Sequence, residues 1–109
     1  MTAGVAYKVL RPDEWASFIG THYSGTAADL ADGFIHLSTA EQLESTLERH
    51  YSDCREVVVL TVDLGAINGL RWEPSRGGAL FPHLYAPLPR GAVMSAEQRS
   101  IPFTQAPVG

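Results

Sequence analysis

An unbroken apolar run, V-V-V-L-T-V-D-L, occupies residues 57–64. Its β-branched side chains favour a strand over a helix. Because apolar residues fall on both faces of that strand, both faces need to be covered by other parts of the protein, which is typical of a strand inside a sheet. We therefore expect this segment to be the central strand of a sheet.

Two helices are expected before this strand. The sequence P-D-E at residues 12–14 places proline in a first turn and acids at the positive end of the helix dipole. It predicts a helix that ends near residue 18 or 19. Ser38 and Glu41 stand three residues apart at the head of A-E-Q-L-E-S-T-L-E-R-H-Y, a capping-box pattern that predicts the second helix over residues 39–50.

Several shorter segments have the composition of strands and are bounded by glycine, proline or asparagine. Helices early in the chain and strands late predict an α+β fold with a mixed or antiparallel sheet and two main flanking helices. The expected strands are residues 5–10, a short stretch at His22, and residues 34–38, 70–73 and 92–97.

The 109 residues contain no internal repeat or linker and fit one domain, residues 1–109. We expect its core over about residues 5–97 and a loosely ordered tail at 102–109. The net charge is −4, and the eight Lys and Arg residues form no basic run. This distribution argues against a broad nucleic-acid surface but allows a local phosphate or nucleotide pocket.

Cys54 is the single cysteine, so no internal disulfide forms, and we expect an unreactive reduced thiol. The first residues lack the basic start and apolar run of a signal peptide, and no stretch is long enough to span a membrane. These features predict a cytoplasmic protein without a membrane partner. They give no indication of its oligomeric state.

Residues 77–89, G-G-A-L-F-P-H-L-Y-A-P-L-P, surround one histidine and one tyrosine with glycine and proline. Pro82 favours a stiff, extended backbone next to His83. On a strand, residues two apart share a face, so His83 and Tyr85 are expected to point one way and Leu84 the other. An imidazole beside a phenol suits a small-molecule site, and it equally suits a half-buried polar pair in a core.

By the same alternation, His36 and Ser38 share one face of their strand while Ile35 and Leu37 take the core face. His36 is therefore either a half-buried histidine held by hydrogen bonds or a donor to a ligand hydroxyl or carbonyl. Ser38 favours the second interpretation, because the backbone N–H groups at the start of the following helix attract anionic groups.

The sequence R-W-E at residues 71–73 precedes a loop, and a strand sends Arg71 and Glu73 to one face and Trp72 to the other. We expect a buried Trp72 and a solvated Glu73 paired with Arg76, with a general-base role for Glu73 as the alternative. No metal site is expected, because the four histidines show neither HExxH nor HxH spacing.

The chain contains, in order, the blocks Y-K-V-L-R-P-D-E-W, D-G-F-I-H-L-S-T-A-E-Q-L, V-V-L-T-V-D-L, L-R-W-E and G-A-L-F-P-H-L-Y-A-P-L. This order resembles the bacterial domain-of-unknown-function 952 family over about residues 7–94. The resemblance implies a small cytoplasmic protein with a fold similar to the ADP-ribosylation fold, a split mixed sheet with flanking helices. NAD-cleaving ADP-ribosyltransferases use that fold.

A second likeness, to the latter half of the RNA 2′-phosphotransferases, implies that His36 helps to hold NAD. In ADP-ribosyltransferases the first strand usually offers a histidine or arginine to the cofactor, and Lys8 takes that place here. Their late catalytic glutamate has no counterpart around residues 83–86, and Glu73 is not in register with it. The resemblance therefore implies a fold rather than a reaction.

We expect a cleft for a nucleotide or similar phosphorylated ligand, with NAD as the candidate cofactor and a transferase reaction if the protein is an enzyme. In that reaction His36 would bind ribose hydroxyls, Tyr85 would stack on nicotinamide, and Lys8 would screen the pyrophosphate. Two alternatives stay open: a non-catalytic module for a small metabolite, and a structural or partner-binding protein without a site. The expected catalytic residues are His36 and His83, and the expected ligand-binding residues are Lys8, Ser38, Arg71 and Tyr85.

Overall fold

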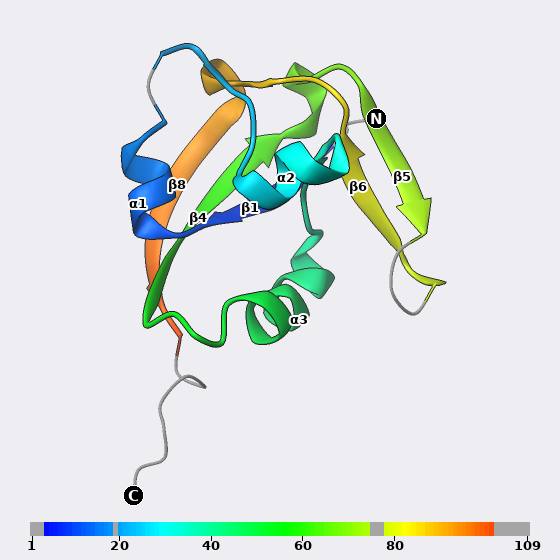
Figure 1. The fold of residues 1–109 in the computed structure, drawn as a ribbon. Coiled ribbons are helices and arrows are strands. Elements are labelled where there is room, and N and C mark those ends of the chain that lie inside the picture. The colour runs from blue at the N-terminus through cyan, green and yellow to red at the C-terminus, as the bar shows by residue number, and fades with distance from the viewer. Residues whose placement is uncertain (1–3, 19, 75–77, 102–109) are drawn as a thin grey trace, which may run out of the picture.

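A computed structural model describes residues 4–18, 20–74 and 78–101 of the chain. The described part is an α+β fold with three small antiparallel sheets and three α-helices (Figure 1). The strands are β1 (Val5–Leu10), β2 (His22–Tyr23), β3 (Ile35–His36), β4 (Glu56–Asp63), β5 (Leu70–Pro74), β6 (Leu80–Leu84), β7 (Leu88–Pro89) and β8 (Val93–Ser100). The helices are α1 (Pro12–Ala16), α2 (Ala27–Asp32) and α3 (Ala40–His50).

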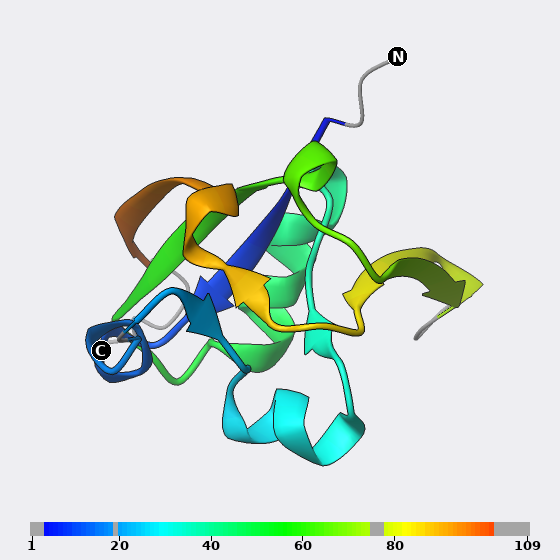
Figure 2. The same cartoon turned by 90° about the horizontal axis from the view of Figure 1, so that it is seen from above.

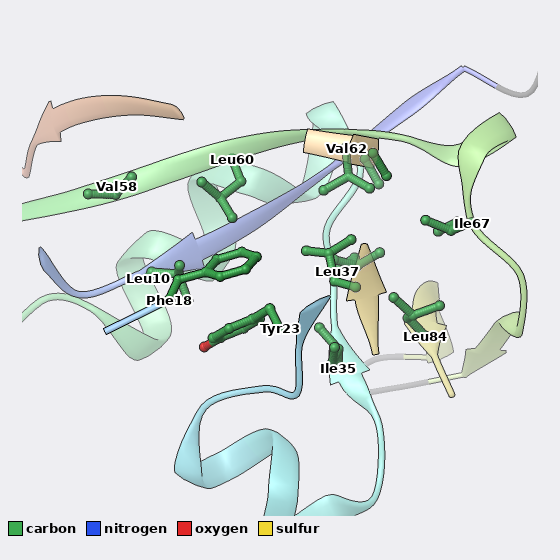
Figure 3. Packing of buried hydrophobic residues seen from close by; sticks show 13 residues of the cluster. Leu10, Phe18, Tyr23, Ile35, Leu37, Val58, Leu60, Val62, Ile67 and Leu84 are labelled. Atoms are coloured by element: carbon green, nitrogen blue, oxygen red, sulfur yellow. The ribbon is translucent and has the colours of Figure 1, made fainter. Parts of the chain in front are cut away.

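The strand β4 lies between β1 and β8 and pairs antiparallel with both, so the apolar run forms a central strand, as its composition predicts. Its alternate side chains enter two separate cores. Val58, Leu60 and Val62 face the larger core, which Figure 3 shows. Val57 and Val59 face a smaller core that α3 helps to close. Both faces of β4 are therefore covered by other elements.

The strands β3, β6 and β5 form a second three-stranded sheet, and β2 pairs with β7. Every pairing among the described strands is antiparallel, so the expectation of a mixed sheet is wrong and the antiparallel alternative holds. Ile35, Leu37 and Leu84 anchor the second sheet in the larger core. The β5–β6 hairpin projects from one side of the molecule, as both views show (Figures 1 and 2).

The longest helix, α3, begins one residue later than its sequence predicts. Thr39 and Gln42 form the capping box, each side chain bonding the other residue's backbone N–H, so the expected pair of Ser38 and Glu41 is wrong. Ser38 is held elsewhere, because its backbone forms an isolated antiparallel bridge with Tyr7 of β1. This bridge connects the two three-stranded sheets.

The two shorter helices also differ from expectation. In α1 the hydroxyl of Ser17 bonds backbone carbonyls of the preceding turn, and the helix ends before residues 18 and 19. The helix α2 occupies a region for which the sequence predicts no helix. It begins with a capping box between Thr26 and Asp29, and it ends at Gly33, whose φ of 87° is the left-handed value that favours glycine.

Trp72 is 46% exposed, so the prediction of its burial is wrong. It stands on β5, the edge strand of its sheet, which pairs with β6 alone among the described strands. The predicted tail at residues 102–109 lies outside the described residues. Among the described helices, none has the length and apolar character needed to cross a membrane.

Candidate functional site

The sheet formed by β3, β6 and β5 brings His36 and His83 together. They are direct cross-strand partners, so their side chains lie on the same face of the sheet. Their ring centroids are 5.7 Å apart, in an edge-to-face arrangement. Arg71 is the partner of His83 on the other neighbouring strand and shares this face. The pairing of three strands thus gathers three of the predicted site residues.

Glu73 approaches the same face from β5. Its Oε1 atom accepts hydrogen bonds from His83 Nδ1 and from the Tyr85 hydroxyl, each 2.7 Å long. The bonds from Tyr85 and His83 hold the pKa of Glu73 below its usual value, and the bond to this carboxylate raises the pKa of Tyr85. Glu73 keeps contact with the solvent, with 33% of its side chain exposed, but it is also held by two hydrogen bonds that the sequence does not predict. Arg76, its expected partner, lies outside the described residues.

Phe34, just before β3, is in contact with all the rings of this face. Its centroid lies 4.0 Å from that of His83 in a stacked arrangement. It also lies 4.6 Å from the centroid of His36 and 5.2 Å from that of Tyr85. We call the following set the histidine face: Phe34, His36, Arg71, Glu73, His83 and Tyr85.

Two aspartates of α2 hold His36. Its Nδ1 lies 2.6 Å from Asp29 Oδ1, and its Nε2 lies 3.0 Å from Asp32 Oδ2. Because an ionised carboxylate only accepts hydrogen bonds, Nδ1 donates to Asp29, whereas Nε2 lies within ion-pair distance of Asp32. A ligand that bonds Nε2 therefore has to displace Asp32, whose side chain is 54% exposed.

Asp29 is the buried centre of this network. Its Oδ2 lies 2.7 Å from Lys8 Nζ and accepts a bond from the Thr26 N–H, while its Oδ1 also accepts the His36 N–H. Burial alone would raise the pKa of Asp29, but the hydrogen bond from His36 and the charge of Lys8 outweigh it and hold that pKa well below its usual value. Burial also lowers the pKa of Lys8. The network ties β1, α2 and β3 together.

Two of the expected ligand-binding residues do not reach the histidine face. Lys8 is 3% exposed and paired with Asp29, so its predicted role of screening a pyrophosphate does not fit its position. Ser38 is also buried, and its hydroxyl shares a 2.8 Å hydrogen bond with that of Thr46 in α3. The predicted residues that the structure does bring together are His36, Arg71, His83 and Tyr85.

A pocket of about 220 Å³ opens beside the histidine face. Phe34 and Tyr85 belong to both, so a ligand in the pocket would touch the face. Pockets that hold drug-sized ligands have volumes of roughly 300–1,000 Å³, so this one has room for a single ring or a small metabolite. Its lining includes Ser24, Leu30, Phe34, Leu84, Tyr85 and Pro87.

Residues 9–96 match the model of a family described as "protein of unknown function (DUF952)". The chain belongs to this family. It is similar to protein CC0527 from Caulobacter crescentus: to its crystal structure with 42% identity and a TM-score of 0.80, covering 86% of this chain and 84% of that chain. The solution NMR structure of CC0527 gives 43% identity and a TM-score of 0.71, covering 85% and 82%. A search of curated proteins found no match.

Family membership confirms the resemblance to DUF952 that the sequence blocks indicate. These structures are not named as ADP-ribosylating proteins, so the expected likeness to that fold stays a prediction. In this DUF952 protein, sequence reasoning missed Asp29, Asp32 and Phe34 as part of the site. The spacing T-A-A-D at residues 26–29 is a capping-box signal that would have identified the start of α2 and its aspartate.

Cys54 of this DUF952 protein belongs to the smaller core and is not part of the histidine face. It is 9% exposed, and burial raises the pKa of its thiol. Arg11 donates a hydrogen bond to its sulfur from 2.6 Å. A thiol with a raised pKa is mostly protonated at neutral pH, in agreement with the unreactive cysteine that we expect from the sequence.

Proposed function

We propose that the histidine face of this DUF952 protein binds a nucleotide of the NAD type and supports transfer of its ADP-ribosyl group. The observation that carries the proposal is the carboxylate of Glu73 between His83 and Tyr85. Residues 83–86 of this chain contain no counterpart of the late catalytic glutamate of ADP-ribosyltransferases. Glu73 supplies a carboxylate to the same face from the neighbouring strand.

The rings of the face favour a flat ligand. Phe34 and Tyr85 line both the face and the adjoining pocket, and the pocket has room for one heteroaromatic ring such as nicotinamide. Arg71 is exposed, and its guanidinium carbon lies 5.3 Å from the centroid of the Tyr85 ring. An exposed guanidinium at this distance from the rings suits a ligand phosphate. The face thus offers stacking and a cation to one ligand.

An NMR titration with NAD tests binding. We expect the backbone amides of Phe34, His36, His83 and Tyr85 to shift at millimolar NAD, while that of Met94 on β8 stays in place. A Tyr85→Ala variant should bind more weakly because the stacking ring is lost, whereas Tyr85→Phe keeps the ring and should retain most of the affinity. If the histidine face shows no shifts at millimolar NAD, the proposal fails.

The volume of the pocket favours a second candidate, a non-catalytic module for a small metabolite. About 220 Å³ is too little to enclose a whole dinucleotide, so most of NAD would lie outside the pocket. Long incubation with NAD, followed by chromatography of released nicotinamide, separates the two candidates. Nicotinamide release that is lost in His83→Gln supports transfer chemistry, while intact NAD with clear amide shifts supports the binding module.

A further inference from the structure

The two nitrogens of the His83 ring have different surroundings. Nδ1 lies 2.7 Å from Glu73 Oε1. Nε2 has no hydrogen-bond partner among the described residues. Among the described residues, every fully buried side-chain nitrogen or oxygen has a hydrogen-bond partner. Since Nε2 has none, this atom is not fully buried and contacts the solvent, although His83 as a whole is only 7% exposed. One nitrogen is therefore held by the protein, and the other is available to a ligand.

The contacts around His83 determine which nitrogen carries the proton of the neutral ring. Glu73 is an acceptor when ionised, so Nδ1 must donate to it. The hydroxyl of Tyr85 donates to the same oxygen, which keeps the carboxylate in place and lowers its pKa further. Phe34 stacks on the ring with a 4.0 Å centroid distance and an interplanar angle of 22°, which restricts rotation of the imidazole. A histidine oriented by a carboxylate in this way exposes the lone pair of its other nitrogen.

We infer that Glu73 is a positioning residue that fixes His83 as the Nδ1–H tautomer, so that Nε2 is the proton acceptor of the histidine face. The inference rests on the proposed function only for the identity of the reaction. In the proposed ADP-ribosyl transfer, the hydroxyl of an acceptor molecule gives its proton to Nε2 while the hydroxyl oxygen forms a bond to the ribose carbon of NAD. The bond from that carbon to nicotinamide breaks, nicotinamide leaves with the electron pair, and the proton on His83 later returns to water.

Nitrogen-15 NMR of histidine-labelled, ligand-free protein tests the positioning role. Long-range nitrogen–proton correlations distinguish the two neutral tautomers at a pH where the ring is neutral. We expect His83 to be mainly Nδ1–H in the wild type and to lose this preference in Glu73→Ala. The matched control, Tyr85→Phe, removes only the second bond to the carboxylate and should keep the Nδ1–H form. The spectrum of His22, far from Glu73 in sequence, should be the same in all three proteins.

Each outcome bears on the inference. An Nε2–H form in the wild type, or an unchanged tautomer in a folded Glu73→Ala variant, overturns it. If Glu73→Ala does not fold, the wild-type tautomer and the result for Tyr85→Phe still support or overturn it. Because the measurement needs no ligand, its result is independent of whether NAD binds, so the inference and the proposed function fail separately.

Discussion

The two histidines of the face lie side by side in the sheet, yet their carboxylate partners differ. The side chain of Asp29 is 1% exposed and bonds Lys8, Thr26 and His36 in the interior. The side chain of Glu73 is 33% exposed. Asp29 joins three elements of the fold, whereas Glu73 joins two neighbouring strands of one hairpin.

This difference assigns different roles to the two pairs. A buried carboxylate that accepts several hydrogen bonds stabilises the folded state. If the carboxylate is removed, each of its buried donors is left without a partner. A carboxylate at the surface with one histidine nitrogen left open suits contact with a ligand. We therefore expect changes at Asp29 to affect stability and changes at Glu73 to affect the chemistry of His83.

The largest effect is expected for Asp29→Asn. This substitution keeps the shape of the side chain but leaves the buried ammonium of Lys8 without its counter-charge, since Lys8 is 3% exposed. Breaking a buried ion pair from one side costs about 3–5 kcal/mol. Urea unfolding should show this loss as a lower free energy of unfolding, a large fraction of the total for a small domain.

Asp32→Asn is the matched control. It makes the same chemical change in the same six-residue helix, α2, but at a side chain that is 54% exposed. It should cost less than about 1 kcal/mol. Adding Lys8→Met to Asp29→Asn should restore part of the lost stability, because the uncompensated charge is then gone. Equal costs for the two asparagine variants would contradict the structural role of Asp29.

A smaller effect is expected in the pH dependence of stability. The pKa of Asp29 is well below its usual value in the folded protein, so the unfolded chain takes up its proton first as the pH falls. The stabilisation is present above about pH 4, the ordinary value of an aspartate, and is lost as the pH falls below it. Unfolding measured from neutral to acidic pH should therefore show a steeper loss in the wild type than in Asp29→Asn.

The acid dependence of stability in Glu73→Gln is to be compared with that in Asp29→Asn. The pKa of Glu73 is also lowered in the folded protein, so the sign of its effect is the same. Its hydrogen bonds lie at the solvent, where screening weakens them, so the variant should change the acid slope less than Asp29→Asn does. A larger change for Glu73→Gln would show that the exposed pair holds the fold.

The parts of the fold that were predictable depend on local patterns. The apolar run predicts the central strand β4, and the alternation in R-W-E correctly separates Arg71 and Glu73 from Trp72. The same pattern does not say which strands are neighbours. The pairing of His36 with His83 depends on long-range strand register, which the larger core sets through the residues on the opposite face.

The hydrogen bonds and ion pairs at the site join residues that are distant in the sequence, which local patterns do not predict. The sequence predicts Arg76 as a partner of Glu73, and Arg76 lies outside the described residues; the partners that the structure shows, His83 and Tyr85, reach Glu73 across the β5–β6 hairpin. The resemblance places Lys8 at a ligand, but in the structure Lys8 is 3% exposed and pairs with Asp29 in the first turn of α2. Such ion pairs form only after strands and helices pack, so no window of sequence contains them.

The smallest effect is expected for Asp32→Ala, which removes the exposed partner of His36 Nε2 and leaves Asp29 on Nδ1. The two histidines of the face should then become more alike, each with one nitrogen held and one open. Diethyl pyrocarbonate acylates unprotonated imidazole nitrogens, and peptide mapping gives the rate at each histidine. An exposed ion pair is worth up to about 1 kcal/mol, so the rate at His36 should rise by at most about fivefold. The rate at His83 in the same sample should not change, because its bond to Glu73 is intact; an unchanged rate at His36 would mean that Asp32 does not hold this ring.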